Sequence, residues 1–309
     1  MGTDAPSTPC ILDDLPVPFE RDVPLAARTW YGVGGCAAVL AHPQSVEQLS
    51  VLARRCGETG APLRVLGKGA NLLVAEGTIS GVVVALDTPG LRGVDIDAST
   101  GRVVAGAGAD LEKVITATVR AGLAGLEVLA GIPATVGGAV RMNAGGAFGE
   151  IGPSVQRITA IEPDGTVASL PREQLQFSYR RSNLRDHIVV EVEFALKRAD
   201  DPAALRERLK EVMKYKKGSQ PMALSSAGCA FKNPPKHLSD RGAGKLIDDA
   251  GLKGFRIGGA EVSPVHANFI VLHEGGAAAD VLAVMRHVEQ AVQERFGVML
   301  EREVVVWSG

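Results

Sequence analysis

Three short segments that lie far apart in the chain carry side chains able to do acid–base or electrostatic chemistry. Arg180 lies in the run 179–182, Cys229 lies among small and polar residues in the run 225–234, and Glu303 begins an otherwise apolar segment. A guanidinium can stabilise developing negative charge, a thiol can donate a proton, and a carboxyl group in an apolar setting holds its proton more tightly. Each also has an ordinary explanation, as an exposed arginine, a buried small side chain and a strand-edge carboxylate. Only convergence of the three in space favours a catalytic site, and sequence spacing does not show it.

Two glycine-rich segments are candidates for holding phosphate. The stretch 125–149 carries seven glycines and only two charges, and the run 67–71 reads Gly-Lys-Gly-Ala-Asn. Bare N–H groups from 133–138 could face an anion, although a tight crossing of two chain segments would need the same glycines. The run 67–71 fits neither a Rossmann fingerprint, since a strand follows it, nor a Walker loop, since no Lys-Ser or Lys-Thr follows. Taken together, the two loops predict the two sides of a long, bent dinucleotide such as FAD.

Composition excludes several other classes of protein. Net charge is −2 with no basic stripe, and aromatic residues make up only 4%, so neither a nucleic-acid polymer nor an anionic membrane is an expected partner. The four cysteines, which form no CxxC pair, predict no metal site and fit a reducing compartment. No signal peptide or membrane-spanning run is found, so a cytoplasmic location is expected.

The elements expected to position these residues group into three units. A strand–helix–strand order, with Ser45 as the helix cap and Gly60 as its stop, predicts a small α/β unit first. The second unit is predicted to be mostly strands, with a helix capped by Asp110 and a central strand over 188–197. A charged helix near 201 opens the third unit. The expected helices are 46–59, 111–121, 203–217, 244–250 and 277–296, and the expected strands are 36–41, 62–66, 72–75, 81–86, 94–97, 102–107, 155–162, 166–170, 188–197, 269–272 and 303–307.

Seven segments, in this order along the chain, resemble the UDP-N-acetylenolpyruvoylglucosamine reductase (MurB) family, the FAD enzymes that complete UDP-N-acetylmuramic acid for bacterial wall synthesis. The resemblance covers nearly all of residues 29–306. The matching runs are LGKGANLLV (66–74), GLEVLAGIPATVGGAVRMNAG (125–145), YRRS (179–182), SAGCAFKNP (226–234), GKLIDDAGLKG (244–254), GGAEVSPVHANFIV (258–271) and LEREV (300–304). The short third unit resembles the class that lacks an extra tyrosine-bearing substrate loop.

The resemblance implies an α+β fold: a two-subdomain FAD-binding fold of the PCMH or vanillyl-alcohol-oxidase type, followed by a C-terminal α/β substrate domain. We expect an N-terminal arm over 1–22, read as loose because it is proline-rich and aperiodic, then subdomains over 23–88 and 89–200 and the substrate domain over 201–309. The expected partners are a UDP-sugar and NADPH, the expected cofactor is non-covalent FAD, and the chain is expected to be a monomer.

By the same resemblance, the catalytic residues are Arg180, Cys229 and Glu303. The implied cofactor-binding residues are Tyr31, Gly67, Lys68, Gly69, Ala70, Asn71, Leu72, Gly131, Ile132, Pro133, Thr135, Gly137, Gly138, Ala139, Asn143, Ala144 and Gly145. The implied substrate-binding residues are Tyr179, Lys217, Gln220, Asn233, His266 and Asn268.

The implied reaction reduces an enolpyruvyl ether with hydride that passes from NADPH through FAD, and Cys229 then protonates the resulting carbanion. The family more often has Ser at Cys229 and Gly at Ala134, so the chain departs from it at the proton donor. A thiol is a better acid than an alcohol, and cations such as Lys232 or Arg180 could lower its pKa further. Two other functions stay open here: another FAD-dependent oxidase of the same superfamily, and a flavin- or sugar-nucleotide-binding module without catalysis.

Overall fold

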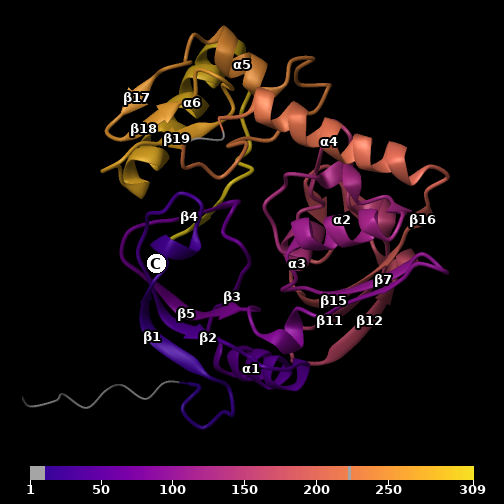
Figure 1. Ribbon diagram of the computed structural model, residues 1–309. Helices are drawn as coiled ribbons and strands as arrows, with labels where there is room; N and C mark the ends of the chain where they lie inside the picture. Colours follow the sequence, from indigo (N-terminus) through magenta and orange to yellow (C-terminus); the bar gives the residue numbers. More distant parts are fainter. Residues whose placement is uncertain (1–10, 222–223) are drawn as a thin grey trace, which may run out of the picture.

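The first unit is a four-stranded sheet with one helix against it. The computed structural model describes residues 11–221 and 224–309 (Figure 1). The strands lie in the order β1 (Phe19–Pro24), β2 (Cys36–Ala41), β5 (Thr78–Ala85) and β3 (Leu63–Leu66), with β1 antiparallel and the others parallel. Helix α1 (Val46–Thr59) begins where the Ser45 hydroxyl accepts a hydrogen bond from the Gln48 N–H, and it ends at Gly60 with φ of 69°. The predicted strand–helix–strand unit is confirmed.

The expectation of a loose arm is wrong for the described part of residues 1–22. β1 pairs with β2 as an edge strand, and Leu12 and Val17 are buried in the core. Aperiodic, proline-rich sequence suits an edge strand, because an edge strand needs only one side of its backbone ladder paired. Residues 1–10 lie outside the described residues.

The second unit is a five-stranded antiparallel sheet. Its order is β12 (Val167–Pro171), β11 (Val155–Ile161), β15 (Ile188–Ala195), β7 (Arg102–Gly106) and β6 (Val94–Asp97). The β-branched strand β15 is central, as predicted. Helix α2 (Leu111–Arg120) begins at its predicted cap Asp110, and α2 and the short helix α3 (Val136–Arg141) lie over the same face of the sheet (Figure 1).

The third unit has its own apolar core and a small sheet. Strands β17 (Arg256–Ile257), β18 (Ala260–Val262) and β19 (Ile270–Leu272) pack against α6 (Ala278–Phe296), with α5 (Ala243–Asp249) beside it. Helix α4 (Pro202–Ser219) extends from this unit across the second one (Figure 1), and its Leu205 packs in the core that the first two units share.

The last strand leaves the third unit. β20 (Val305–Trp307) pairs in parallel with β4 (Leu72–Val74), which directly follows the run 67–71. The Asn71 side chain also donates to the Glu303 carbonyl at 3.0 Å, across 232 residues of sequence. The C-terminus therefore carries Glu303 back to the first unit.

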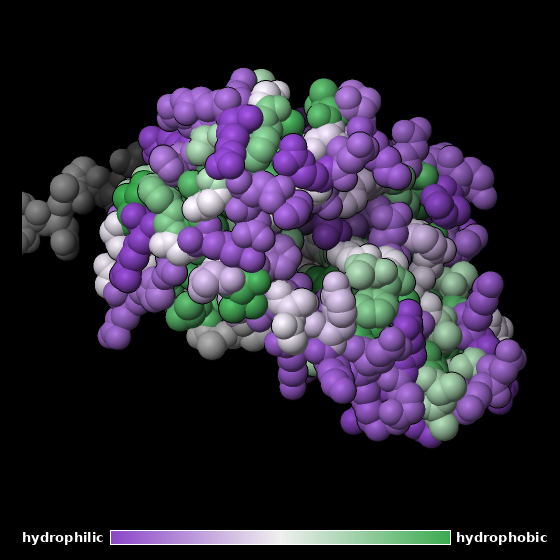
Figure 2. Space-filling view, turned by 90° about the horizontal axis from the view of Figure 1, so that it is seen from above, coloured by the Kyte–Doolittle hydropathy of each residue, from purple (hydrophilic) through white to green (hydrophobic). Residues whose placement is uncertain are grey.

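On the face shown in Figure 2, hydrophilic side chains dominate, and apolar side chains appear in small separate groups. Within the residues that the structure describes, no helix is both long and apolar enough to cross a bilayer.

Candidate active site

One large cavity lies where the three units meet. Its volume is about 1390 Å³, above the ~300–1,000 Å³ typical of small-ligand pockets, so it has room for a dinucleotide together with a second ligand. The described side chains that line it include eight Lys and Arg residues and five Asp and Glu residues. This lining favours an anionic ligand.

Arg180, Cys229 and Glu303 all line this cavity. Nε of Arg180 lies 2.5 Å from Oε1 of Glu303, and the Glu303 N–H donates to the Ala230 carbonyl at 2.8 Å. Cys229, the residue before Ala230, is therefore held beside Glu303 by main-chain pairing. The three segments that looked unrelated in the sequence converge.

Arg180 reaches the cavity from a strained turn. It follows β13 (Phe177–Ser178) and precedes β14 (Arg181–Ser182), and its φ of 55° is a left-handed conformation that side-chain-bearing residues rarely adopt. Its buried Nε is ion-paired with Glu303 but makes no hydrogen bond of good geometry with a described residue. Strain of this kind is retained mainly at functional sites, and an unmade buried bond leaves a donor for a ligand.

Burial controls the proton affinities of these groups. Burial and then the Glu303 charge raise the pKa of the Cys229 thiol to about 12, although Arg180 acts in the opposite direction. The expectation that nearby cations bring this pKa below its ordinary value is wrong, because desolvation of the thiolate outweighs the lowering by Arg180. Burial likewise raises the pKa of Glu303, and Arg180 only partly offsets it.

The two glycine-rich loops meet, but they differ in kind. A Cβ built on Gly67 would lie 2.8 Å from Oγ1 of Thr135. No described residue accepts a hydrogen bond from the backbone N–H groups of residues 68–71, so this loop presents a row of free donors to the cavity. Such a concave row of N–H groups suits a phosphate.

The expectation of bare N–H groups in 133–138 is wrong for residues 136–138, whereas the N–H groups of Ala134 and Thr135 donate to no described residue. The N–H groups of Val136 and Gly137 donate to Ala109 and Ala107 at 2.9 Å, and that of Gly138 donates to the Thr135 hydroxyl at 3.3 Å as the cap of α3. A Cβ on Gly137 would lie 2.7 Å from the Ala107 side chain. The glycine here permits a close chain crossing, which was the alternative explanation.

Most of the residues predicted to bind the cofactor line the cavity. They are Gly67, Lys68, Gly69, Ala70, Asn71, Leu72, Gly131, Ile132, Pro133, Thr135, Gly137, Gly138, Ala139, Ala144 and Gly145. Tyr31 and Asn143 do not. Buried Tyr31 donates to the Ile270 carbonyl at 3.0 Å, and buried Asn143 bonds the Ser178 carbonyl and the Gly152 N–H, so both have structural roles.

The predicted substrate residues are divided. Gln220 and His266 line the cavity, whereas Lys217 is exposed and its neighbour Lys216 is buried in the wall. Lys216 lies one helical turn beyond the buried Val212 of α4, so helical periodicity could have selected it. Burial, and then Arg180, lower the Lys216 pKa to about 8.

Three further predicted residues do not line the cavity. Tyr179 and Asn233 contact each other through the Asn233 N–H and the tyrosine hydroxyl at 3.3 Å, and the Asn233 side chain accepts from the first N–H of α5. Asn268 is buried and bonds both main-chain groups of Phe231, which supports the strand-like segment that carries Cys229. The Asn233 and Asn268 side chains therefore stabilise the main chain around the cavity.

Sequence reasoning missed several lining residues. Trp30 and Arg28 precede any recognisable motif, and Phe148 and Tyr215 meet edge to face at 5.2 Å across two units. No local pattern marks them, because their proximity depends on tertiary packing. Among the described side chains, no group of three or more His, Cys, Asp or Glu could hold a metal ion, so no metal is assigned here.

The fold and the cavity together define a flavin-dependent oxidoreductase. Residues 37–170 match the profile of the FAD binding domain, and residues 220–307 match that of the UDP-N-acetylenolpyruvoylglucosamine reductase C-terminal domain. The free N–H row, the cationic lining and the apolar glycine-rich wall fit a dinucleotide cofactor. The predicted fold, an FAD-binding domain followed by a C-terminal domain, is confirmed.

Comparison with individual proteins narrows the class. UDP-N-acetylenolpyruvoylglucosamine reductase from Heliobacterium modesticaldum is 42% identical over 290 residues, 93% of this chain and 90% of its own length. The enzyme of the same name from Halalkalibacterium halodurans is 40% identical over 283 residues, 91% of each chain. The crystal structure of the reductase (MurB) from Thermus caldophilus superposes with a TM-score of 0.78 at 40% identity, covering 94% of this chain and 100% of the other. The chain belongs to the UDP-N-acetylenolpyruvoylglucosamine reductase family.

Proposed function

We propose that the chain reduces the enolpyruvyl ether of UDP-N-acetylenolpyruvoylglucosamine to UDP-N-acetylmuramate, a peptidoglycan precursor, with NADPH as reductant and non-covalent FAD as carrier. The observation that carries this proposal is the meeting of Arg180, Glu303 and Cys229 on one cavity wall. When bound, FAD would be held by the free N–H groups of the loop 67–71 and would supply hydride transfer from NADPH to the terminal carbon of the vinyl group. The excess of cationic side chains in the lining suits both anionic substrates.

Arg180 and Glu303 stabilise the charge that develops on the substrate. Hydride addition to the vinyl group places negative charge on the neighbouring carbon and its carboxylate. Arg180 offers a permanently charged, planar set of donors beside the Glu303 carboxyl group. Glu303, whose pKa is raised by burial, donates a hydrogen bond to the same carboxylate when it is protonated.

Cys229 completes the reaction by proton transfer. Its S–H bond breaks as a C–H bond forms at the carbon that carries the negative charge, which leaves a thiolate. Because burial raises the thiol pKa to about 12, the donor is protonated throughout the neutral range. The thiol therefore keeps its proton even though the cation of Arg180 lies nearby.

Lys216, Gln220 and His266 are proposed to contact the substrate rather than the cofactor. They line the same cavity as Cys229 and come from the third unit. Lys216, with a pKa lowered to about 8, still carries its charge at pH 7 and suits a diphosphate oxygen. It replaces the predicted Lys217 in this role.

The two half-reactions of Cys229→Ala test the proposal. The variant should let NADPH bleach the flavin at the wild-type rate and should lose at least about 100-fold in substrate reduction, in line with the loss of a general acid. Both rates are measured by stopped-flow absorbance. Cys229→Ser should keep part of the second rate, because the hydroxyl retains a proton.

Cys36→Ala is the matched control, since Cys36 lies in β2 and away from the cavity lining. It should leave both half-reactions unchanged. Equal loss of both half-reactions in Cys229→Ala contradicts the donor role. Oxygen consumption without any need for NADPH would instead indicate an oxidase.

A further inference from the structure

We propose that Arg28 binds the diphosphate of FAD, and that Asp87 and His42 are positioning residues that aim its guanidinium. None of these residues belongs to a motif of the sequence or to the three converging catalytic groups. The proposal concerns cofactor binding alone, so its test does not depend on which substrate is reduced.

Arg28 lies directly behind the loop with free N–H groups. Gly69 has φ of +63°, and a Cβ built on it would overlap the Arg28 carbonyl oxygen. The N–H of Trp30 donates to the Gly69 carbonyl at 3.2 Å, which joins the two segments. Arg28 and the loop 67–71 line the same cavity, so both can contribute to binding one anionic ligand there.

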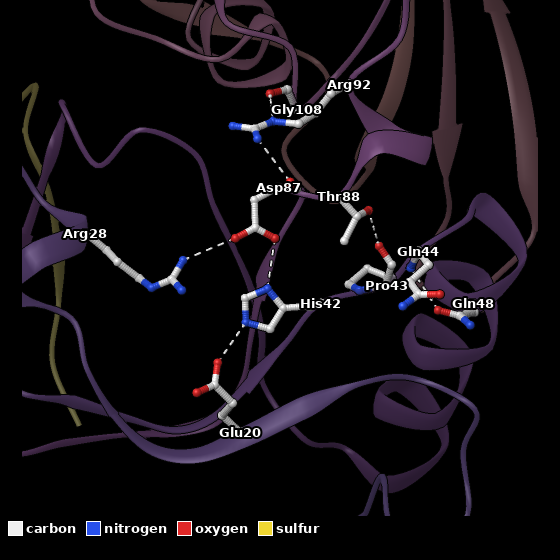
Figure 3. Close-up of polar contacts among 10 residues, drawn as sticks. All are labelled: Glu20, Arg28, His42, Pro43, Gln44, Gln48, Asp87, Thr88, Arg92 and Gly108. Carbon is white, nitrogen blue, oxygen red and sulfur yellow. Dashed lines mark hydrogen bonds and ion pairs between the residues drawn. The ribbon is translucent and has the colours of Figure 1, made fainter.

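A chain of polar side chains fixes the direction of this guanidinium (Figure 3). Nη1 of Arg28 donates to Oδ2 of Asp87 at 3.3 Å, and Oδ1 of Asp87 lies 2.8 Å from Nδ1 of His42. Nε2 of His42, a buried atom, lies 3.3 Å from Oε1 of Glu20. Glu20 belongs to β1, His42 follows β2 and Asp87 follows β5, so three neighbouring strands of one sheet hold the chain.

The main chain of Asp87 is fixed by a hydrogen bond from Arg92, and this fixes the position of its carboxylate. The Asp87 carbonyl accepts from Nη1 of Arg92 at 3.0 Å, and Nε of Arg92 donates to the Gly108 carbonyl at 3.2 Å (Figure 3). Burial by itself would raise the Asp87 pKa, but His42 and Arg28 together lower it, so the group is ionised at neutral pH. An ionised, anchored carboxylate is a rigid support for a long cationic side chain.

Arg28 still has donors to offer. A guanidinium has five N–H donors, and Asp87 occupies one of them in a long bond. About a third of the side chain, 34%, is exposed. The other cation of the loop, Lys68, is paired more tightly, with Nζ 2.6 Å from Oδ2 of Asp110. Arg28 is therefore better placed to receive a phosphate oxygen.

The first experiment measures binding of FAD and of riboflavin to the FAD-free protein by quenching of flavin fluorescence. Arg28→Ala should raise the Kd for FAD by about 10- to 100-fold, the usual cost of a charge-assisted hydrogen bond, and should leave the Kd for riboflavin unchanged because riboflavin has no phosphate. Arg28→Gln, of similar length, serves if the alanine variant does not fold. Arg102→Ala is the matched control, because Arg102 is paired with Glu193 outside the cavity lining.

The second experiment separates aiming from simple electrostatics. Asp87→Asn removes a negative charge near the ligand, so electrostatics alone would tighten FAD binding. If Asp87 aims Arg28, the same change weakens binding, and it does so only while Arg28 is present. In the Arg28→Ala background, Asp87→Asn should leave the Kd unchanged or lower it.

A third comparison tests His42 by conservative rescue. His42→Ala should weaken FAD binding, whereas His42→Asn should restore it, because the asparagine amide places a donor where Nδ1 of the ring lies. Equal losses for FAD and riboflavin in Arg28→Ala would overturn the diphosphate assignment. Tighter FAD binding in Asp87→Asn alone, or failure of His42→Asn to recover binding, would overturn the positioning role.

Discussion

The Cys229 thiol and the Glu303 carboxyl group lie on one wall beside a permanent cation, and burial governs both. Arg180 lowers the proton affinity of each, yet the pKa of each is raised. Desolvation dominates because a charged group loses more solvation on burial than one ion pair returns. Both groups therefore bind their protons more tightly than the same residues do in water.

For Cys229, we expect slow alkylation of the FAD-free protein by iodoacetamide across the neutral range. The rate should keep rising with pH toward about 12, because the thiolate appears only as pH approaches the raised pKa. Mass spectrometry after timed quenching measures the rate, with Cys229→Ser as the blank for the other cysteines. A plateau near the ordinary thiol pKa of 9.0 would contradict the expected burial.

For Glu303, we expect a contribution to stability that falls as pH rises. Its pKa is higher in the folded than in the unfolded chain, so the proton is held more tightly when folded. That stabilisation is complete below the unfolded pKa of about 4.5 and is lost as pH rises through the folded pKa. Denaturant unfolding of wild type and Glu303→Gln at several pH values measures it: the wild-type advantage should shrink with rising pH.

Glu301→Gln is the control with the opposite sign. The hydrogen bond from Lys232 lowers the Glu301 pKa, although burial acts against it, so its stabilisation is present at neutral pH and is lost on acidification. The effect should be small because the side chain is 56% exposed. Parallel pH dependences for the two variants would refute the assignment of Glu303 as the buried member.

At the scale of elements, α3 and the loop 67–71 perform different tasks. The start of α3 is a close contact between two main chains, in which Gly137 rests on Ala107 and the Thr135 hydroxyl caps the helix. The loop 67–71 keeps its N–H groups free and follows β3 into β4. The close packing of Gly137 on Ala107 therefore holds α3 in place, and Thr135 at the start of α3 lies against Gly67 of the anion-binding loop.

Gly137→Ala should destabilise the protein by about 1–3 kcal/mol, the usual cost of overpacking, and should weaken FAD retention. The added methyl group would lie 2.7 Å from the Ala107 Cβ and would push the start of α3 away from Ala107. Thermal unfolding and the flavin content of the purified protein measure both effects. Gly93→Ala is the control, since Gly93 lies outside the cavity lining and its Cβ would meet nothing within 4 Å; similar losses in both variants would contradict the crossing argument.

At the scale of the whole molecule, one cavity joins three units. The first two share a core, the third has its own, and β20 returns to pair with β4. A ligand that fills the cavity touches all three and binds only the folded chain. Its binding free energy therefore adds to the stability of the whole chain.

FAD removal should lower the melting temperature of all three units together. At a free FAD concentration about 100-fold above Kd, the cofactor should add about 2.7 kcal/mol to the free energy of unfolding. Calorimetry with and without added FAD measures this, and riboflavin at the same concentration tests the contribution of the diphosphate. Separate transitions, with only one that responds to FAD, would mean that the units unfold independently.

Local sequence determined the elements and the chemistry available to the site. Caps and stops such as Ser45, Gly60 and Asp110 act within one or two turns, so helices α1 and α2 could be predicted almost to the residue. The β-branched run of β15 likewise predicted a central strand. The side-chain types at Arg180, Cys229 and Glu303 restricted the possible reactions before any contact was known.

Tertiary structure alone decided how those groups behave. The pKa of Cys229 depends on burial by distant segments, and the choice of Lys216 over Lys217 depends on which face of α4 meets the second unit. The Asn143 side chain forms hydrogen bonds with main-chain groups up to 35 residues away, so its amide is not free to bind the cofactor. Desolvation and contact are properties of segments far apart in sequence, and only the folded chain brings such segments together.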